Sequence, residues 1–274
     1  MRVAVAQFTA SLDPAANREA VAKLTAEAAG GGAELVVFPE AAARDFGEPP
    51  EPLAPVAEPL DGPFAGTLGR LARGHRAVIV AGMLERIDGS STHAFNTVIA
   101  VGPDGSLLGA YRKLHLFDAF GHKESDRIRP GGGATLLFQH GGLTFGVLTC
   151  YDLRFPELAR ALADGGADAL LVSAAWVQGP LKEDHWVTLT RARAIENTSY
   201  VLGAGQVGNI YCGRSRVVDP LGVLVASLGE QPGVAVAEIS AERVAAVRAT
   251  LPALQHRRFT VQLRPPNAGN SGRG

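Results

Sequence analysis

The chain has 274 residues, of which 46% are hydrophobic and 19% charged, which suits one large domain or two small ones with a sizeable core. Its 26 lysines and arginines balance 27 aspartates and glutamates, and this near-zero net charge argues against a nucleic-acid or membrane-surface partner. No apolar stretch is long enough to span a membrane, the first residues lack a signal-peptide pattern, and the two cysteines, Cys150 and Cys212, cannot form a disulfide framework, so we expect a cytoplasmic protein.

The first elements follow a β-α-β pattern. Residues 2–8 are a continuous run of small and β-branched side chains, typical of a buried strand. Asp13 is predicted to cap a helix that has Pro14 at its first position and ends at the glycines 30–32. The next strand is predicted at 33–40, and a β-α-β opening favours a parallel pair of strands.

A loop rich in proline and glutamate at 47–63 separates this opening from the later elements. The later strands are predicted at 77–86, twice within 94–113, and at 143–150, 167–175, 199–207, twice within 214–228, and at 234–239. The later helices are predicted at 64–73, 156–163, 184–197 with Asp184 as its cap, and about 241–250. Hairpin turns are expected at 103–105 and 219–222. The pattern suits an α/β fold in which helices cover the outer faces of two packed, mixed sheets in a single domain, 1–264, and we expect the tail 265–274 to be disordered.

Three chemically complementary side chains end three of these strands: Glu40, Lys113 and Cys150. Ligands of open α/β folds bind beyond the carboxyl ends of strands. Each residue alone has an ordinary explanation, as a solvated glutamate, a lysine that protects a sheet edge, or a cysteine that packs as a small hydrophobic group. Together they predict a cysteine hydrolase, in which the carboxylate takes the thiol proton and the ammonium stabilises the developing oxyanion. The backbone N–H of Tyr151, at a strand-to-helix turn, is the expected second oxyanion donor.

Three segments resemble the signature segments of the nitrilase superfamily of carbon–nitrogen hydrolases: FPE at 38–40, YRKLHLFD at 111–118 and CYDLRFPEL at 150–158. The resemblance continues in 185–201 and 213–222, so it covers nearly the whole chain. The order Glu, Lys, Cys is that of the family. The closest branch is that of the Nit-type amidases, which include deaminated-glutathione amidase and ω-amidase.

This resemblance implies a four-layer α-β-β-α sandwich, a homodimer, and no metal or organic cofactor. It also implies a catalytic triad of Glu40, Lys113 and Cys150. The segment KESDRIRPGG at 123–132 matches the family's second glutamate, so the resemblance gives Glu124 that role. The implied reaction converts a small primary carboxamide to its acid and ammonia through a thioester on the cysteine.

The sequence defines the cleaved bond better than the substrate. Residues 150–152, Cys-Tyr-Asp, resemble the amidase branch, whereas nitrile-hydrolysing members tend to have Cys-Trp-Glu. An N-carbamoyl-amino-acid hydrolase or a nitrilase on the same scaffold, and a catalytically silent binding protein, are the alternatives. Monoamides of short dicarboxylates are the favoured substrates. Arg154, Lys182 or another residue of the loop 177–186 is a candidate for receiving the second carboxylate.

Two residues near the cysteine and one after the next strand have more than one interpretation. Asp152 and Arg154 can orient a substrate carboxylate, but we favour buried ion pairs that fix the cysteine turn. Trp176 is either a substrate-binding wall of the pocket or an anchor of the core.

The histidines and the second cysteine give weaker signals. The seven histidines show no metal-ligand spacing. His115 or His185 can in principle pair with Cys150 as in a papain-like enzyme, although His185 is expected to pack or cap the helix start. Cys212 lies in a loop, and we expect it to have no catalytic part.

Overall fold

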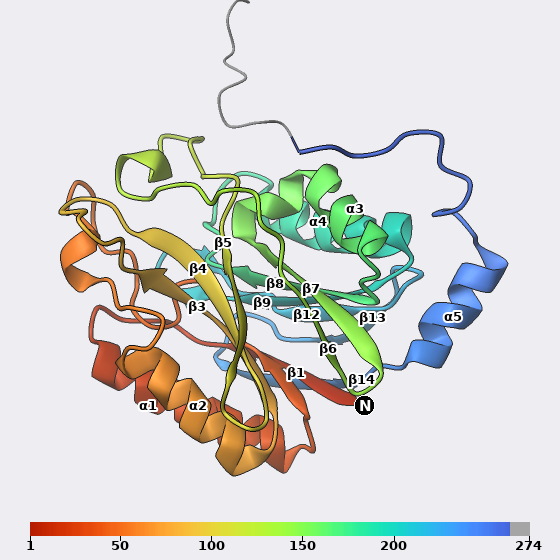
Figure 1. The fold of residues 1–274 in the computed structure, drawn as a ribbon, viewed down its shortest axis with the longest axis horizontal. Coiled ribbons are helices and arrows are strands. Elements are labelled where there is room, and N and C mark those ends of the chain that lie inside the picture. The colour runs from red at the N-terminus through yellow and green to blue at the C-terminus, as the bar shows by residue number, and fades with distance from the viewer. Residues whose placement is uncertain (264–274) are drawn as a thin grey trace, which may run out of the picture.

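The computed structural model describes residues 1–263. It contains two six-stranded sheets, in the orders β14-β1-β2-β3-β4-β5 and β13-β12-β9-β8-β7-β6. Helices α1 and α2 cover the outer face of the first sheet, and α3 and α4 cover that of the second (Figure 1). The expected α-β-β-α sandwich of two mixed sheets is therefore confirmed, whereas the tail predicted to be disordered lies outside the described residues.

The elements have the following bounds. The first sheet consists of β1 (Arg2–Gln7), β2 (Leu35–Val37), β3 (Val78–Glu85), β4 (Phe95–Val101), β5 (Leu107–Arg112) and β14 (Gly233–Glu238). The second consists of β6 (Leu137–His140), β7 (Leu143–Thr149), β8 (Ala169–Ala174), β9 (Tyr200–Gly205), β12 (Arg216–Val218) and β13 (Leu224–Ser227). The short strands β10 (Val207–Gly208) and β11 (Tyr211–Cys212) pair with each other. The helices are α1 (Pro14–Gly30), α2 (Pro63–His75), α3 (Pro156–Asp164), α4 (Lys182–Asn197) and α5 (Ala241–Thr250), with short 3-10 turns η1 (Ala54–Val56), η2 (Glu124–Asp126) and η3 (Cys150–Arg154).

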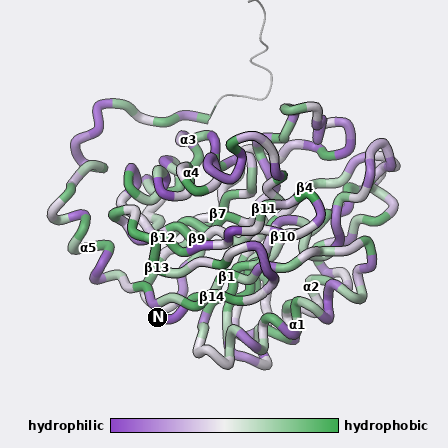
Figure 2. Tube along the Cα trace, turned by 180° about the vertical axis from the view of Figure 1, so that it is seen from behind, coloured by the Kyte–Doolittle hydropathy of each residue, from purple (hydrophilic) through white to green (hydrophobic). Residues whose placement is uncertain are grey.

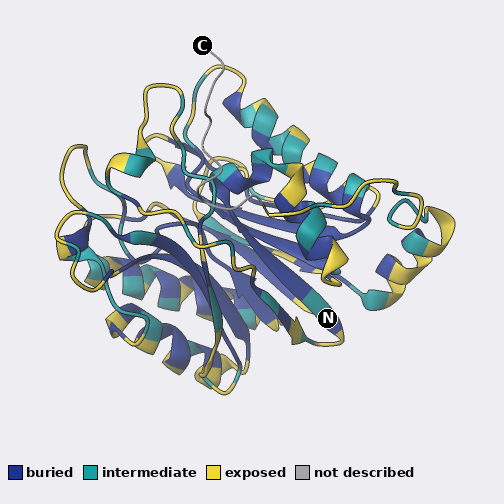
Figure 3. Cartoon of the chain, turned by 45° about the horizontal axis from the view of Figure 1, so that its top comes forward, coloured by how far each residue is buried: buried dark blue, intermediate teal, exposed yellow. Residues whose placement is uncertain are grey.

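The continuous apolar run of β1 is explained by burial on both faces. Val3 and Val5 pack in the cluster between the two sheets, whereas Ala4 and Ala6 pack against α1 and α2. The same arrangement recurs along the central strands, which are hydrophobic in Figure 2 and buried in Figure 3. The two sheets thus form a packed support, and Glu40, Lys113 and Cys150 follow the ends of its strands.

Strand direction brings two of the predicted site residues, Glu40 and Lys113, to one edge of the first sheet. β1, β2 and β3 are parallel, and β4 is antiparallel to both β3 and β5. Consequently β5 runs in the same direction as β2, and their carboxyl ends, which precede Lys113 and Glu40, lie on the same side. In the second sheet, β7, β8 and β9 are parallel.

Several predicted boundaries are corrected by the structure. Asp13 caps α1, since its side chain accepts a hydrogen bond from Ala15 N at 2.8 Å, as predicted. The cap predicted at Asp184 was wrong, because α4 begins at Lys182 after Leu181 in the left-handed conformation and has no side-chain cap. β2 is shorter than the predicted 33–40, and β6 was not predicted. Within the described part of the chain, no helix is both long and apolar enough to cross a membrane.

Candidate active site

The side chains that end the separate strands meet in a buried network between the two sheets. Lys113 Nζ donates to Glu40 Oε1 at 2.9 Å, and both residues are almost fully buried. Lys113 Nζ also donates to Glu124 Oε2 at 2.8 Å. The other oxygen of Glu40 accepts from Ala175 N, which follows β8 in the second sheet, at 2.7 Å. The carboxylate of Glu40 therefore links the two sheets at the site.

A further amide, Asn96 on β4, orients both glutamates. Its Nδ2 donates to Glu40 Oε1 at 2.7 Å and to Glu124 Oε1 at 2.9 Å. Glu124 is fixed in addition by Phe117 N, which donates to Oε2 at 2.7 Å. Sequence reasoning did not select Asn96. The available signal was a buried polar residue at the start of an otherwise apolar strand.

The charges of this network determine the protonation of its members. Burial alone lowers the pKa of the Lys113 ammonium, but the charges of Glu124 and Glu40 outweigh burial and raise the pKa well above its usual range. Burial raises the pKa of the Cys150 thiol, and the Glu40 carboxylate raises it further, while Lys113 opposes both. The net result is a thiol pKa well above the ordinary value, so the resting thiol is protonated.

The turn that carries Cys150 is held by Asp152, which is completely buried. Asp152 accepts hydrogen bonds from Tyr111 Oη at 2.7 Å, from His115 N at 3.0 Å and from Thr149 N at 3.0 Å. Cys150 directly follows β7 and has a φ of +46°, in the left-handed region that non-glycine residues rarely adopt. Such strain persists only where the surroundings enforce it. The four-residue support around this turn fixes the position of the thiol.

The backbone of Glu40 is also closely supported. Gln206 Nε2 donates to Glu40 O at 3.0 Å. Gly82 on β3 lies so close that a Cβ added there would be 2.6 Å from the Glu40 Cα. A larger residue at 82 would therefore displace the carboxylate. This requirement for glycine was not recognised from the sequence, although Gly82 interrupts an apolar strand.

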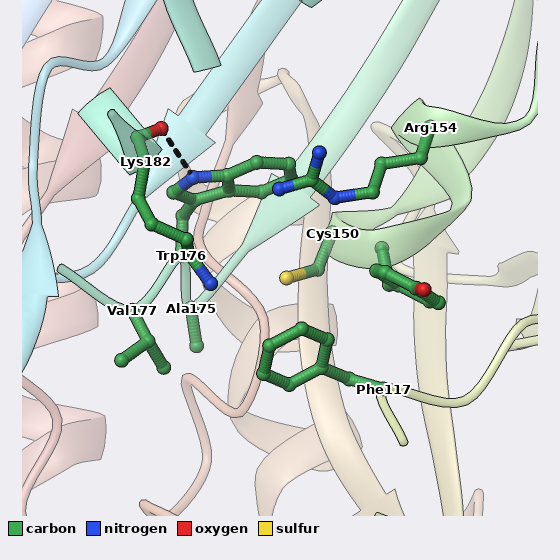
Figure 4. Close-up of a pocket in the computed structure, with 8 residues that line it drawn as sticks. Phe117, Cys150, Arg154, Ala175, Trp176, Val177 and Lys182 are labelled. Atoms are coloured by element: carbon green, nitrogen blue, oxygen red, sulfur yellow. Dashed lines mark hydrogen bonds between the residues drawn. The ribbon is translucent and has the colours of Figure 1, made fainter. Parts of the chain in front are cut away.

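A pocket opens beside the thiol, with an empty volume of about 220 Å³, part of it open to solvent. It is lined by Phe117, Cys150, Tyr151, Arg154, Ala175, Trp176, Val177 and Lys182 (Figure 4). The structure thus places both predicted substrate-binding residues, Tyr151 and Trp176, on the wall. Trp176 is anchored by Nε1, which donates to Lys182 O at 2.8 Å.

One expectation about the neighbouring residues needs correction. Asp152 fixes the cysteine turn as expected, and its Oδ1 lies 2.7 Å from His115 Nδ1, but Arg154 does not form the buried ion pair that we favoured. No carboxylate within residues 1–263 pairs with Arg154, whose guanidinium instead stacks on the Trp176 ring, 4.8 Å from its centroid.

The two candidate histidines and Cys212 do not line the pocket that holds the thiol. His115 Nδ1 is 2.7 Å from Asp152 Oδ1, and His185 Nδ1 is 3.3 Å from Arg154 Nη2. Neither imidazole lines the pocket. Cys212 is buried away from the pocket wall, and burial raises the pKa of its thiol to about 12.

Comparison with known proteins extends these observations. The profile of the carbon–nitrogen hydrolase family matches residues 2–249. Deaminated glutathione amidase from Escherichia coli O157:H7 is 41% identical over 259 residues, which cover 94% of this chain and 98% of that protein. A CN-hydrolase superfamily protein from Xanthomonas campestris, solved with an arsenic adduct in its active site, has a TM-score of 0.84 and 32% identity, with 96% and 98% of the two chains covered. Nit3 of Saccharomyces cerevisiae, a member of branch 10 of the nitrilase superfamily, has a TM-score of 0.81 and 30% identity, with 94% and 97% covered.

Proposed function

The chain belongs to the carbon–nitrogen hydrolase family, and from this premise we propose that it is an amidase whose nucleophile is Cys150. The resemblance to the nitrilase superfamily is confirmed by these relatives. The observation that carries the proposal is the buried network in which Lys113 joins Glu40 and Glu124 next to the thiol pocket. Glu40, Lys113 and Cys150 are the proposed triad.

Glu40 is the proposed general base. Because the pKa of the Cys150 thiol is raised, attack on a carbonyl carbon requires the proton to leave at the same time. Glu40 receives it as the S–C bond forms and the carbonyl electrons move to oxygen. The Glu40 carboxylate suits this role because it is buried beside the thiol and held in place by Lys113 and the backbone N–H of Ala175.

Lys113 and the N–H of Tyr151 are the proposed donors to the resulting oxyanion. The Lys113 ammonium keeps its charge because the two glutamates hold its pKa high. Fixed donors aimed at a developing charge need no reorganisation during the reaction.

The second half of the reaction uses the same groups in reverse. Glu40 gives its proton to the leaving nitrogen, the C–N bond breaks, and ammonia departs from a thioester. Water then attacks this thioester while Glu40 takes a proton from the water, and the proton returns to the sulfur as the S–C bond breaks. Glu124, fixed by Lys113 and Asn96, positions the amide or the water.

The proposed substrate is a small primary carboxamide, with monoamides of short dicarboxylates favoured. The limited pocket volume supports a small acyl group. The amidase named among the relatives supports an amide over a nitrile or carbamoyl compound. We further propose that the enzyme acts as a cytoplasmic homodimer of single-domain chains, with residues 1–264 as the domain.

The test is a panel of primary amides, carbamoyl compounds and nitriles, scored by ammonia release. Amides are expected to be the best substrates, and intact-mass spectrometry should detect an acyl group on Cys150. Comparable kcat/KM on an aliphatic nitrile and its matching amide would overturn the amide assignment. Activity confined to carbamoyl substrates would indicate the neighbouring branch, and no turnover with no acylation would indicate a silent binding protein.

A further inference from the structure

One wall of the pocket is held by residues 210–212, which include the short strand β11. Trp176 and Val177 of this wall line the pocket beside Cys150 (Figure 4). The hydrogen bonds that join the two segments are Cys212 N to Trp176 O at 2.9 Å, Gln178 N to Ile210 O at 2.7 Å, and Gln178 Nε2 to Tyr211 O at 3.0 Å. The position of the wall therefore depends on how residues 210–212 are held.

A side-chain hydrogen bond ties this segment to the loop that follows Glu40. Tyr211 Oη donates to Asp45 Oδ1 at 2.9 Å. Tyr211 is 4% exposed and Asp45 is 7% exposed, so water has little access to either group. Asp45 is fixed in turn, because its N–H donates to Ser11 O at 3.0 Å. The bond thus connects the wall of the pocket with the segment that carries the proposed base.

The surroundings keep the phenol of Tyr211 protonated, as a donor must be. Burial raises the pKa of this phenol, and the negative charge of Asp45 raises it further. Burial also raises the pKa of the Asp45 carboxyl, and the hydrogen bond from Tyr211 opposes that rise. Glu40 and Cys150 act on the pKa of the phenol in the same direction as Asp45, which agrees with its place next to the site.

The two ends of the pocket wall are supported by different contacts. At one end, Ala175 N donates to Glu40 Oε2 at 2.7 Å. At the other end, Val177 pairs with Tyr211 in an antiparallel bridge. Loss of the bond between Tyr211 and Asp45 would leave the Ala175 end tied to the proposed base and weaken the support of the Val177 end. The expected result is a wider pocket around a base that stays in place.

We propose that Tyr211 is a positioning residue that, through Asp45, holds the Val177 end of the wall and so limits the length of the acyl group that reaches Cys150. This inference rests on the proposed amidase function and names what restricts the acyl side of the substrate. Tyr211 does not line the pocket, so it acts through Val177. A wall that cannot yield rejects additional methylene groups, whereas a wall that can move outward accepts them.

The test compares propanamide with hexanamide, which differ only in the length of the acyl chain. Tyr211→Phe removes the donor and keeps the ring, and Asp45→Ala removes the acceptor. Each is expected to reduce the preference for propanamide, measured as the ratio of the two kcat/KM values, by at least about tenfold. The double variant should show no further reduction, because both changes break the same bond. Asp45→Asn keeps a carbonyl acceptor and should retain most of the wild-type ratio.

Tyr200→Phe is the matched control. Tyr200 is also 4% exposed, and its hydroxyl accepts a hydrogen bond from Ser240 N at 3.4 Å. It lies at the start of β9, whereas Cys150 and Ala175 follow the ends of β7 and β8, the strands parallel to β9. This variant should keep the wild-type ratio even where its melting temperature falls. A bond with a purely structural role would give the same result at Tyr211.

Alkylation of Cys150 tests the wall without turnover. The rates with 2-chloroacetamide and 2-chlorohexanamide are followed by intact-mass spectrometry, and Tyr211→Phe is expected to shift their ratio toward the longer reagent. Hydrolysis of both amides with an unchanged kcat/KM ratio in Tyr211→Phe and Asp45→Ala would overturn the inference while leaving the amidase function intact. A shifted alkylation ratio, with no amide hydrolysed by the wild type, would overturn the function and support the role of Tyr211.

Discussion

The surroundings of Cys150 and Cys212 give the two thiols different expected reactivities. Both thiols are buried, and burial raises the pKa of each. Only Cys150 combines a strained turn, a neighbouring carboxylate and a pocket. Reactivity here therefore depends on the groups around the sulfur, and a low resting pKa is not required when a base is at hand.

We expect Cys150→Ala to abolish amide turnover, because no other thiol lines the pocket. The change removes one atom from a turn that Asp152 holds independently, so the circular dichroism spectrum and melting temperature should stay close to wild type. Cys212→Ser, the control, should keep most of the activity. Substantial turnover by Cys150→Ala would contradict the whole mechanism.

Glu40→Gln should stop acylation while preserving shape. A general base typically contributes about 10²- to 10⁴-fold to the rate, so kcat should fall by at least about 100-fold. His115→Ala should cost far less, since Tyr111 and the backbone continue to hold Asp152. Pre-steady-state acylation followed by mass spectrometry is the measurement. If His115→Ala were as inactive as Glu40→Gln, the result would indicate a cysteine–histidine mechanism.

At the scale of the elements, β3 contributes space to the site through Gly82. Gly82→Ala should displace Glu40, because the new Cβ would lie 2.6 Å from the Glu40 Cα. Overpacking of this kind costs about 1–3 kcal/mol of the free energy of unfolding. We expect kcat to fall more than the loss of stability explains, as measured by activity at a temperature where the variant is fully folded.

Gly74→Ala is the matched control for this change. Gly74 lies in α2, and a Cβ there would meet no atom within 4 Å. The substitution should leave activity unchanged and stabilise the helix by up to about 1 kcal/mol. A Gly82→Ala variant with full activity would show that Glu40 tolerates displacement.

The order of the main strands and helices could be predicted because it depends on local periodicity, whereas bounds such as those of β2 could not. The start of α4 was misplaced, since Asp184 has the composition of a cap while the left-handed Leu181 begins the helix two residues earlier than expected. The role of Asp152 as the support of the cysteine turn depends on Tyr111 and His115, more than 35 residues away in the chain. Buried ion pairs were predicted for Asp152 and Arg154 without named partners, because such long-range contacts cannot be read from the sequence.

Asn96 and Gly82 illustrate the same limit. Asn96 is an amide and Gly82 a glycine within largely apolar strands. Their roles become clear only from the contacts of β3 and β4 with Glu40. The sequence likewise does not show that Arg154 has no carboxylate partner among the described residues. By contrast, Glu40, Lys113 and Cys150 could be selected as a set, because each follows the carboxyl end of a predicted strand, where ligands of open α/β folds bind.

On the scale of the whole molecule, exposed apolar side chains are concentrated on the β12–β13 hairpin and the neighbouring α4. Leu221, Val223, Leu224 and Val225 of the hairpin are exposed large hydrophobic residues, as is Ile195 of α4. The two elements touch, since Arg191 Nε donates to Gly222 O at 3.0 Å. Exposed apolar side chains that gather in one region commonly mark an interface between proteins.

We expect two copies of the chain to associate through this surface, because an isologous contact buries the same patch on both partners. Light scattering should give about twice the chain mass of 28.5 kDa. The double variant Val223→Lys/Val225→Lys should shift the mass toward the monomer, since like charges would face each other across a symmetric contact. Leu107→Lys, a comparable change at an exposed apolar residue of β5, is the control and should keep the wild-type mass. A wild type that remains monomeric at working concentration would contradict the dimer, and a double variant that remains dimeric would place the interface elsewhere.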